Sequence, residues 1–418
     1  MFYLLFTFYL LCACYLVTRA GFVKKTDLSN VTILFLFILK IAAAVLLGWM
    51  SQRYYPQGND YWGLNQNGWN EYLVMTSDPK RFLTDIFQSN YGDDYGGFFR
   101  AFGSFWNDLK NTLIGKLLAV CNIFSRGNYY INSLFFNLMG FFGHVALFRV
   151  FSHIYSNKRK WALITGSFLL PSTLYFSSGI HKDLVVFCML GLYSYALYFS
   201  MVDRMTVRRL ALLFTSFIAL LFIRNFLAIA IIPASIAFVI SIKRKWKPAR
   251  VFAAIYLSGF LLLAILEVAM PSFQPLSVVS LRQKEFLELP YASSQLDKHI
   301  LEPNIKSLVR NTPEAINHSV LQPYAWNAPT RFLVPLAIEL LIYQLLFIGM
   351  LIFNRPHLRF NAFILYGICL SATMLLFTGY VVPNIGAIVR YRSLYLPFLI
   401  TPVLYQLFAR FSSGRKTN

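Results

Sequence analysis

Charged residues are scarce in this chain. They make up 13% of its 418 residues, about half the share found in ordinary soluble proteins. Hydrophobic residues make up 57% and recur in runs of about 20, the length that a helix needs to cross the hydrocarbon core of a bilayer. In a soluble domain such runs would alternate with polar faces, and here they do not. The sequence therefore predicts an all-α fold, a polytopic bundle of transmembrane helices.

Acidic residues are even scarcer than basic ones, with 17 Asp and Glu against 38 Lys and Arg. The excess is concentrated in six short segments that contain 19 Lys and Arg but only two acids, Asp27 and Asp203, a net charge of +17. Short loops rich in Lys and Arg stay on the cytoplasmic side. The basicity therefore indicates topology, not a nucleic-acid partner. The six segments are 19–30, 153–160, 203–209, 243–250, 354–360 and 410–418.

Cysteine is also rare, and its spacing suits neither a disulfide framework nor a metal site. All five cysteines lie within or beside apolar runs, which predicts that they are small packing residues. They are Cys12, Cys14, Cys121, Cys188 and Cys369.

The apolar runs and their basic flanks predict about eleven crossings, with the N-terminus outside and the C-terminus in the cytoplasm. A signal peptide is not expected, because the positive charges follow the first run instead of preceding it. The run 210–242 is too long for one helix, and its two basic flanks predict a hairpin with Arg224 at the outer turn. Two large loops, 51–127 and 271–332, fall outside. The runs are 2–17, 31–50, 129–151, 161–178, 184–201, 210–242, 251–270, 333–353, 362–380 and 394–409.

The first outer loop contains a carboxylate among aromatic residues. Asp60 follows soon after the second run, and Trp62 and Trp69 lie close to it in the sequence. Aromatic planes stack on sugar rings, and a partly desolvated carboxylate can act as a general base. The alternative is structural, because tryptophan is enriched at any membrane interface and Asp commonly caps helices.

The same loop contains a second acidic pair, Asp93 and Asp94, in a glycine-rich stretch. Carboxylate oxygens of this kind can bind Mg²⁺ or Mn²⁺, although two adjacent aspartates also suit a solvated turn. The segment 98–124 then shows apolar residues at helical spacing. It predicts an amphipathic helix, or a pair of helices, in the outer interface.

The stretch 171–183 places three ionisable residues, His181, Lys182 and Asp183, at the outer end of an apolar run. Positive side chains there suit the phosphate of a lipid head group, and a helix that begins near Asp183 would add its N-terminal dipole. The alternative is an interfacial loop with a capping Asp.

The last outer loop contains Arg390, Tyr391 and Arg392. Arginines on the outer side run against the positive-inside bias, which indicates an anionic partner. That partner is either a phosphate or pyrophosphate, or a structural carboxylate such as Glu267 or Glu339.

Three features together resemble the GT-C class of membrane glycosyltransferases and the related O-antigen-type surface-polysaccharide polymerases. They are an acidic residue in a large first outer loop (Asp60), the stretch Pro-Ser…Ser-Ser-Gly-Ile-His-Lys-Asp (171–183), and the run Arg-Tyr-Arg-Ser-Leu-Tyr-Leu-Pro (390–397). The resemblance implies transfer from a polyprenyl-linked sugar donor to a saccharide acceptor, in envelope synthesis at the bacterial plasma membrane.

The resemblance also implies roles for residues. Asp60 would be the base, and Lys182, Arg390 and Arg392, with Arg224 second, would bind the phosphate of the donor. Two other functions remain open, a transporter or flippase for lipid-linked saccharide and a non-catalytic subunit of an envelope assembly. A transporter should place charges along a central pathway, whereas these residues lie at the outer ends of the runs.

Overall fold

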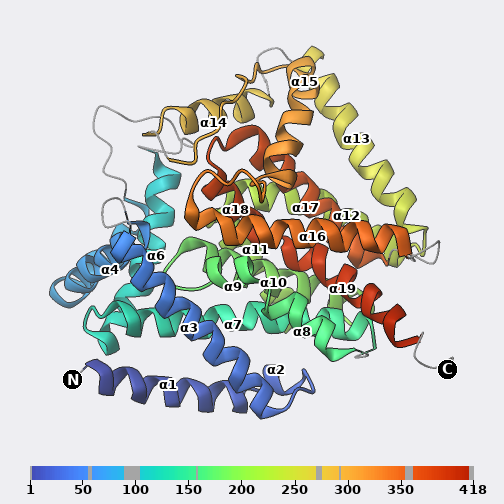
Figure 1. Cartoon of the computed structure of the whole chain (residues 1–418). Coiled ribbons are helices and arrows are strands. Elements are labelled where there is room, and N and C mark those ends of the chain that lie inside the picture. Colours follow the sequence, from blue (N-terminus) through green and yellow to red (C-terminus); the bar gives the residue numbers. More distant parts are fainter. Residues whose placement is uncertain are drawn as a thin grey trace. The chain divides into compact units, whose positions relative to one another are not determined.

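The computed structural model describes residues 2–54, 59–88, 104–156, 159–269, 275–290, 293–353 and 361–413. In these ranges the regular elements are α-helices, with two 3₁₀ turns and one π turn between some of them (Figure 1). Two isolated β-bridges also occur in these ranges. The all-α prediction is confirmed. The predicted metal ligands Asp93 and Asp94 and the start of the amphipathic segment, 98–103, lie outside the described residues.

Eight of the described helices are long and apolar enough to span a membrane, which agrees with an integral membrane protein. The predicted count of about eleven crossings stays a prediction. The eight are α1 (Phe2–Arg19), α3 (Asn30–Tyr54), α7 (Tyr129–Ile154), α10 (Lys182–Val202), α12 (Asn225–Lys243), α13 (Pro248–Ala269), α16 (Val334–Phe353) and α17 (Ala362–Val381).

The remaining predicted crossings form shorter helices. The run 161–178 divides into α8 (Lys160–Phe168) and α9 (Pro171–Phe176), because proline has no N–H to continue a helix. The run 210–242 also breaks where expected, since α11 (Val207–Ile223) ends just before Arg224 and α12 begins just after it. The last run is α19 (Leu396–Ser413), which contains Pro402.

The chain divides into two compact units. Unit 1 comprises residues 1–154, 174–196 and 210–225, and unit 2 comprises residues 155–173, 197–209 and 226–418. Helices α9, α10 and α11 each contribute to both units.

In unit 1, α1, α3 and α7 run side by side (Figure 1). The first large loop is itself helical, formed by α4 (Asp60–Ser77), α5 (Pro79–Thr84), the turn η1 (Asp85–Phe87) and α6 (Phe105–Ser125). Helices α4 and α6 are in close contact, since a Cβ atom on Gly68 would lie 2.3 Å from the Cβ of Leu118. Helix α6 buries Leu118 and exposes Ile123 and Phe124, and its predicted amphipathic role in the membrane interface stays a prediction.

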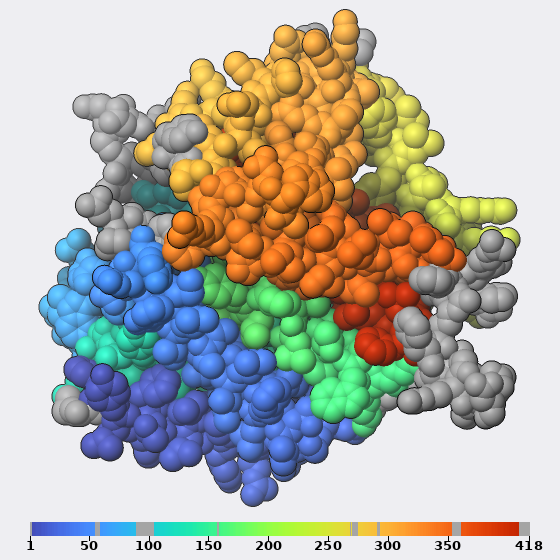
Figure 2. Space-filling view, in the orientation of Figure 1, coloured from blue at the N-terminus to red at the C-terminus, as the bar shows by residue number. Residues whose placement is uncertain are grey.

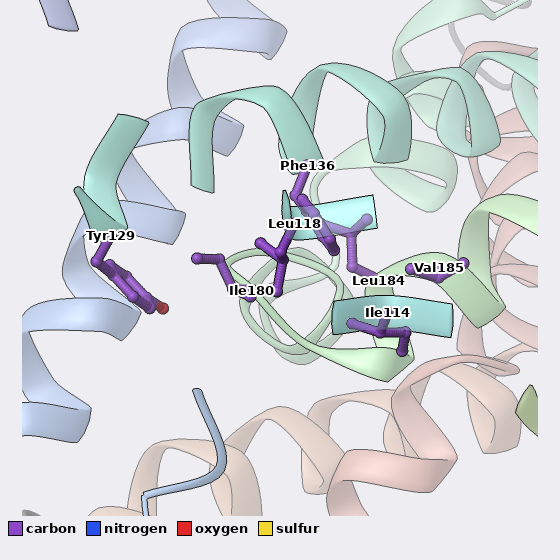
Figure 3. Packing of buried hydrophobic residues seen from close by; sticks show 7 residues of the cluster. All are labelled: Ile114, Leu118, Tyr129, Phe136, Ile180, Leu184 and Val185. Atoms are coloured by element: carbon purple, nitrogen blue, oxygen red, sulfur yellow. The ribbon is translucent and has the colours of Figure 1, made fainter. Parts of the chain in front are cut away.

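A buried apolar cluster joins α6, α7 and α10 to the turn that precedes α10. Figure 3 shows Leu118, Phe136 and Leu184 converging, with Ile180 of the turn beside them. Ile180 and Leu184 have no exposed surface. Residues 177–183, which contain three predicted site residues, are therefore anchored in a core.

In unit 2, the second large loop packs on α17. It contains α14 (Ser277–Leu287), α15 (Ile305–Ile316) and the π turn η2 (Asn317–Leu321), followed by the 3₁₀ turn η3 (Arg331–Leu333). A Cβ atom on Gly379 of α17 would lie 2.1 Å from the carbonyl oxygen of Ala315, which shows how close α15 approaches. The short helix α18 (Ile385–Ser393) follows α17, and α19 packs against α8.

The surface carries apolar side chains where lipid contact is expected. In unit 1, α1 exposes Tyr3, Leu4 and Leu11, and in unit 2, α13 exposes Leu257 and Ile265. Figure 2 shows the atoms of α1 (dark blue) and α13 (yellow) on the surface. Such exposed apolar helices are typical of proteins that use the bilayer as solvent.

Candidate functional site

Asp60 is the first residue of α4, and its side chain is 64% exposed. The helix starts there because the side chain of Asn59 accepts hydrogen bonds from the backbone N–H groups of Tyr61 and Trp62, at 3.1 and 3.4 Å. Asn59 is thus the cap, and the carboxylate of Asp60 is largely exposed to solvent. A carboxylate in the first turn is also stabilised by the helix dipole.

The turn 177–183 is held in one conformation by its glycine. Gly179 has a φ of +77°, and a Cβ atom at this position would lie 2.8 Å from Leu47 of α3. A larger residue would meet both backbone strain and a clash. The next residue, Ile180, is fully buried, so the following His181 is presented from a rigid support.

His181 lies between two carboxylates. Its Nδ1 is 3.0 Å from Oδ2 of Asp183, and its Nε2 is 4.0 Å from Oδ2 of Asp60. The backbone N–H of Asp183 donates a hydrogen bond to Nδ1 at 3.1 Å. Nδ1 is therefore the acceptor, and in the neutral ring the proton is assigned to Nε2, on the side of Asp60.

Asp183 is fully buried, and its second oxygen accepts a hydrogen bond of 2.6 Å from Nη2 of Arg224. Arg224 occupies the break between α11 and α12, so the break positions the guanidinium. A buried carboxylate is stable only when it is paired and hydrogen-bonded. The guanidinium of Arg224 compensates the carboxylate of Asp183, which lies against the His181 ring.

These four residues form one chain of contacts, Asp60–His181–Asp183–Arg224, which we call the relay network. Along it the exposed fraction of the side chain falls from 64% at Asp60 to 5% at His181 and 0% at Asp183. The sequence analysis named all four residues, but it assigned phosphate binding to Arg224. The structure instead pairs that guanidinium with Asp183.

Lys182 extends from the same turn toward α6, where its Nζ lies 2.5 Å from Oδ1 of Asn111. A role of Lys182 in binding an anion stays a prediction.

The two predicted sugar-stacking tryptophans take part in packing. Trp62 stacks on Tyr129, with ring centroids 4.3 Å apart, and its indole N–H donates to the carbonyl of Gly48 at 3.1 Å. Trp69 stacks on Tyr72 and lies over Gly127, where a Cβ atom would be 2.9 Å from its ring. Both side chains thus support the fold of the first loop, and their role in stacking on sugars stays a prediction.

The residues predicted in the last outer loop belong to unit 2, in α18. Arg392 is only 4% exposed, and its Nη1 donates to the carbonyl oxygens of Ser319 and Gln322, at 3.0 and 2.7 Å. Burial lowers the pKa of Arg392 to about 10, and Glu339 and Tyr343 act in the opposite direction. The group stays protonated at neutral pH and supports the second loop.

Arg390 lies over the ring of its neighbour Tyr391, with the guanidinium carbon 5.2 Å from the ring centroid. Burial also lowers the pKa of Arg282 on α14, and Tyr391 is among the groups that oppose this shift. The assignment of Arg390 and Tyr391 to phosphate binding stays a prediction, as does their predicted convergence with Asp60 on one outer cleft.

The carboxylates considered as structural partners for these arginines have other hydrogen bonds. Glu267 accepts one from the backbone N–H of Ile305 at 3.1 Å. Glu339 accepts hydrogen bonds from the N–H and hydroxyl groups of Ser172 and from the hydroxyl of Tyr343. Glu339 nevertheless lies near enough to affect Arg392, as noted above.

Metal ligands do not gather in the described part of the chain, where no group of three or more His, Cys, Asp or Glu side chains is placed to hold an ion. The candidate pair Asp93 and Asp94 lies beyond that part.

A second buried cluster was missed by the sequence analysis. Lys40 of α3 contacts His144 of α7 and the serines at the start of the turn, Ser177 and Ser178. The signal was present, because a lysine in a transmembrane run is uncommon and marks a candidate site. It was overlooked because the run 31–50 was used only as evidence of a crossing.

A scan against protein-family models and searches of curated proteins and of solved structures found no match to this chain.

Proposed function

We propose that this protein is a membrane glycosyltransferase. Its donor would be a sugar linked to polyprenyl phosphate or pyrophosphate, used on the non-cytoplasmic face in the synthesis of an envelope polysaccharide or glycoconjugate. The observation that carries the proposal is the relay network, in which an exposed carboxylate is backed by a histidine that a buried carboxylate orients. An Asp–His pair of this kind is suited to accepting a proton.

The reaction would proceed by attack of an acceptor hydroxyl on the anomeric carbon of the donor. As the new C–O bond forms, the bond from that carbon to the phosphate oxygen breaks, and the phosphate leaves with the electron pair. The hydroxyl proton passes to the carboxylate of Asp60, beside which Asp183 holds the ring of His181.

The leaving phosphate needs a fixed cation as its negative charge develops. In unit 1 we assign this role to Lys182, which is adjacent to His181 in the chain and donates a hydrogen bond to Asn111. Arg224 contributes indirectly, because it neutralises Asp183 and so keeps the relay network in place.

Transport of a lipid-linked saccharide is the second candidate, and one observation favours it. Lys40 and His144 are polar groups within transmembrane helices, where transporters bind their substrates. Both are only 1% exposed, however, so they line no accessible pathway in this structure. We therefore rank catalysis first.

We further propose that the protein lies in a bacterial plasma membrane, with its N-terminus and both large loops outside and its C-terminus inside. Cysteines introduced at Ser77 and Ser293, which are exposed in the two large loops, should react with a membrane-impermeant maleimide in intact cells. The wild-type chain, with five native cysteines, measures the background. If neither cysteine reacts with the maleimide until the cells are lysed, the loops lie in the cytoplasm and the proposed topology is inverted.

The test of function is product formation by the purified full chain in detergent, with a polyprenyl-linked donor and a saccharide acceptor, read by product mass. A transferase forms product without a membrane, whereas a transporter or a structural subunit forms none. Asp60→Asn should lower turnover by about 10²–10⁴, the usual contribution of a positioned base.

Asp78→Asn is the matched control. Asp78 is an exposed carboxylate on the same loop that only caps α5, and asparagine caps helices equally well. The control should retain wild-type turnover. Full activity in Asp60→Asn would remove this residue from the mechanism, and a wild-type chain that forms no product would favour the other two functions.

A further inference from the structure

Lys40 occupies the middle of α3 and is 1% exposed. Its ammonium group donates to the carbonyl oxygen of Ser177 at 2.5 Å and to the hydroxyls of Ser177 and Ser178 at 3.1 and 3.4 Å. Nε2 of His144 lies 3.3 Å from Nζ and 3.0 Å from the Ser177 hydroxyl. We call this cluster the lysine network.

The lysine network contains no acid. None of the ion pairs among the described residues includes Lys40, so its charge is stabilised by neutral oxygen atoms and an imidazole nitrogen. A buried charge is costly, and the strongest contacts open to it are charge-assisted hydrogen bonds. All of its oxygen contacts fall on the first two residues after α9.

Those two residues begin the turn that leads to the relay network. Beyond them, Gly179 packs against Leu47, which is on the same helix as Lys40, and Ile180 enters the apolar cluster. His181 follows directly. Helix α3 therefore holds the turn at two points, by hydrogen bonds at Ser177 and by packing at Gly179.

We propose that Lys40 is a positioning residue that fixes the turn 177–183 and thereby sets the distance between His181 and Asp60. His144 supports it by contacting the Ser177 hydroxyl. The effect on turnover rests on the proposed function, whereas the ordering of the turn does not.

A purely stabilising role makes the opposite prediction for stability. An unpaired buried charge is costly to desolvate, and an apolar side chain of similar length does not carry that cost. Lys40→Met should therefore retain the thermal stability of the wild type while it releases the turn. A lysine needed mainly for stability would instead lower Tm on substitution.

Hydrogen–deuterium exchange on the purified full chain in detergent tests this directly. In Lys40→Met, exchange of the peptide covering 177–183 should accelerate at least about tenfold, as expected from losing charge-assisted hydrogen bonds. Peptides from α4 and α6 should exchange at the wild-type rate. The matched control is Asn137→Leu, because Asn137 is buried in α7 and its amide donates only within that helix, to Ser133.

Ser177→Ala removes one acceptor and keeps the carbonyl contact, so exchange of the same peptide should accelerate by about threefold, a fraction of one hydrogen bond. Unchanged exchange of 177–183 in Lys40→Met would overturn the proposal, as would an equal acceleration across the whole of unit 1. If Lys40→Met cannot be purified, unchanged exchange in Ser177→Ala overturns it.

A kinetic readout separates this inference from the proposed function. Lys40→Met should lower kcat by about tenfold and leave KM for the donor near its wild-type value, because a misplaced His181 affects the proton transfer and not binding. If the wild type forms no product but exchange responds as expected, the proposed function fails and the positioning role stands. If product forms but the exchange of 177–183 does not change in Lys40→Met, the positioning role fails and the proposed function stands.

Discussion

The relay network and the lysine network both contact the turn 177–183, but they differ in charge and in access to solvent. The relay network alternates acids and bases, and it ends at Asp60, whose side chain is 64% exposed. The lysine network has one cation and no acid, and every member is at most 1% exposed. The buried lysine network thus contacts the start of the turn 177–183, and the exposed carboxylate of Asp60 lies near its end.

This difference separates two uses of buried polar groups. In the proposed reaction Asp60 accepts a proton from the acceptor hydroxyl, and carboxylates lie on both sides of the His181 ring. The lysine network has no opening for a substrate and no acid to exchange a proton with the ammonium. It can only hold the backbone in place. Under the two proposals, similar residue types therefore support chemistry in one case and geometry in the other.

The largest expected effect concerns Asp60 and His181 together. If they act as a unit, the double variant Asp60→Asn/His181→Gln should lose about 10²–10⁴ in turnover, no more than Asp60→Asn alone. The measurement is a double-mutant cycle on kcat. Independent, multiplying losses would show that the two residues do not share a proton path.

The next effect is on stability. Asp183→Asn leaves the guanidinium of Arg224 without its buried carboxylate, which typically costs about 3–5 kcal/mol. Asp203→Asn is the control, because Asp203 forms an ion pair with Arg209 of similar length, 2.8 Å, but is 57% exposed. Such pairs contribute about 0–1 kcal/mol. Equal losses of unfolding free energy in the two variants would contradict the burial argument.

A smaller effect, on KM for the donor, is expected from replacing Lys182, the cation in the turn 177–183. Lys182→Gln should raise KM for the donor by about tenfold, because one charge-assisted contact with phosphate is lost. Lys80→Gln, a change at an exposed lysine of α5 in the first loop, should leave KM unaltered. Both values come from steady-state kinetics at one salt concentration. An unchanged KM in Lys182→Gln would mean that the phosphate is bound elsewhere.

Much of the fold follows from sequence patterns. The apolar runs located all eight long helices, and the paired basic flanks placed a break at Arg224, where α11 ends and α12 begins. The run 161–178 was the exception. Pro171 divides it into two short helices, because proline interrupts a helix even in an apolar setting.

The residues of the candidate site could be predicted from the sequence, but the contacts between them could not. His181 and Asp183 are neighbours in the chain, whereas Arg224 is 41 positions beyond Asp183. No local pattern encodes that contact, because it arises when the turn before α10 meets the break after α11. The same limit applies to Arg392, whose two carbonyl partners lie 70 or more positions away. The arginines of this segment suggested an anionic partner, and a role of Arg392 in binding one stays a prediction.

The pH dependence of kcat tests the central contrast most directly. In the wild type, kcat should fall at low pH as the proton acceptors of the relay network become protonated. His181→Gln should move this acidic limb, because it replaces the ring that lies beside the Asp60 carboxylate. Lys40→Met should lower kcat at every pH and leave the limb where it is. A shifted limb in Lys40→Met, or an unshifted one in His181→Gln, would contradict the division between a network that carries protons and one that holds the turn.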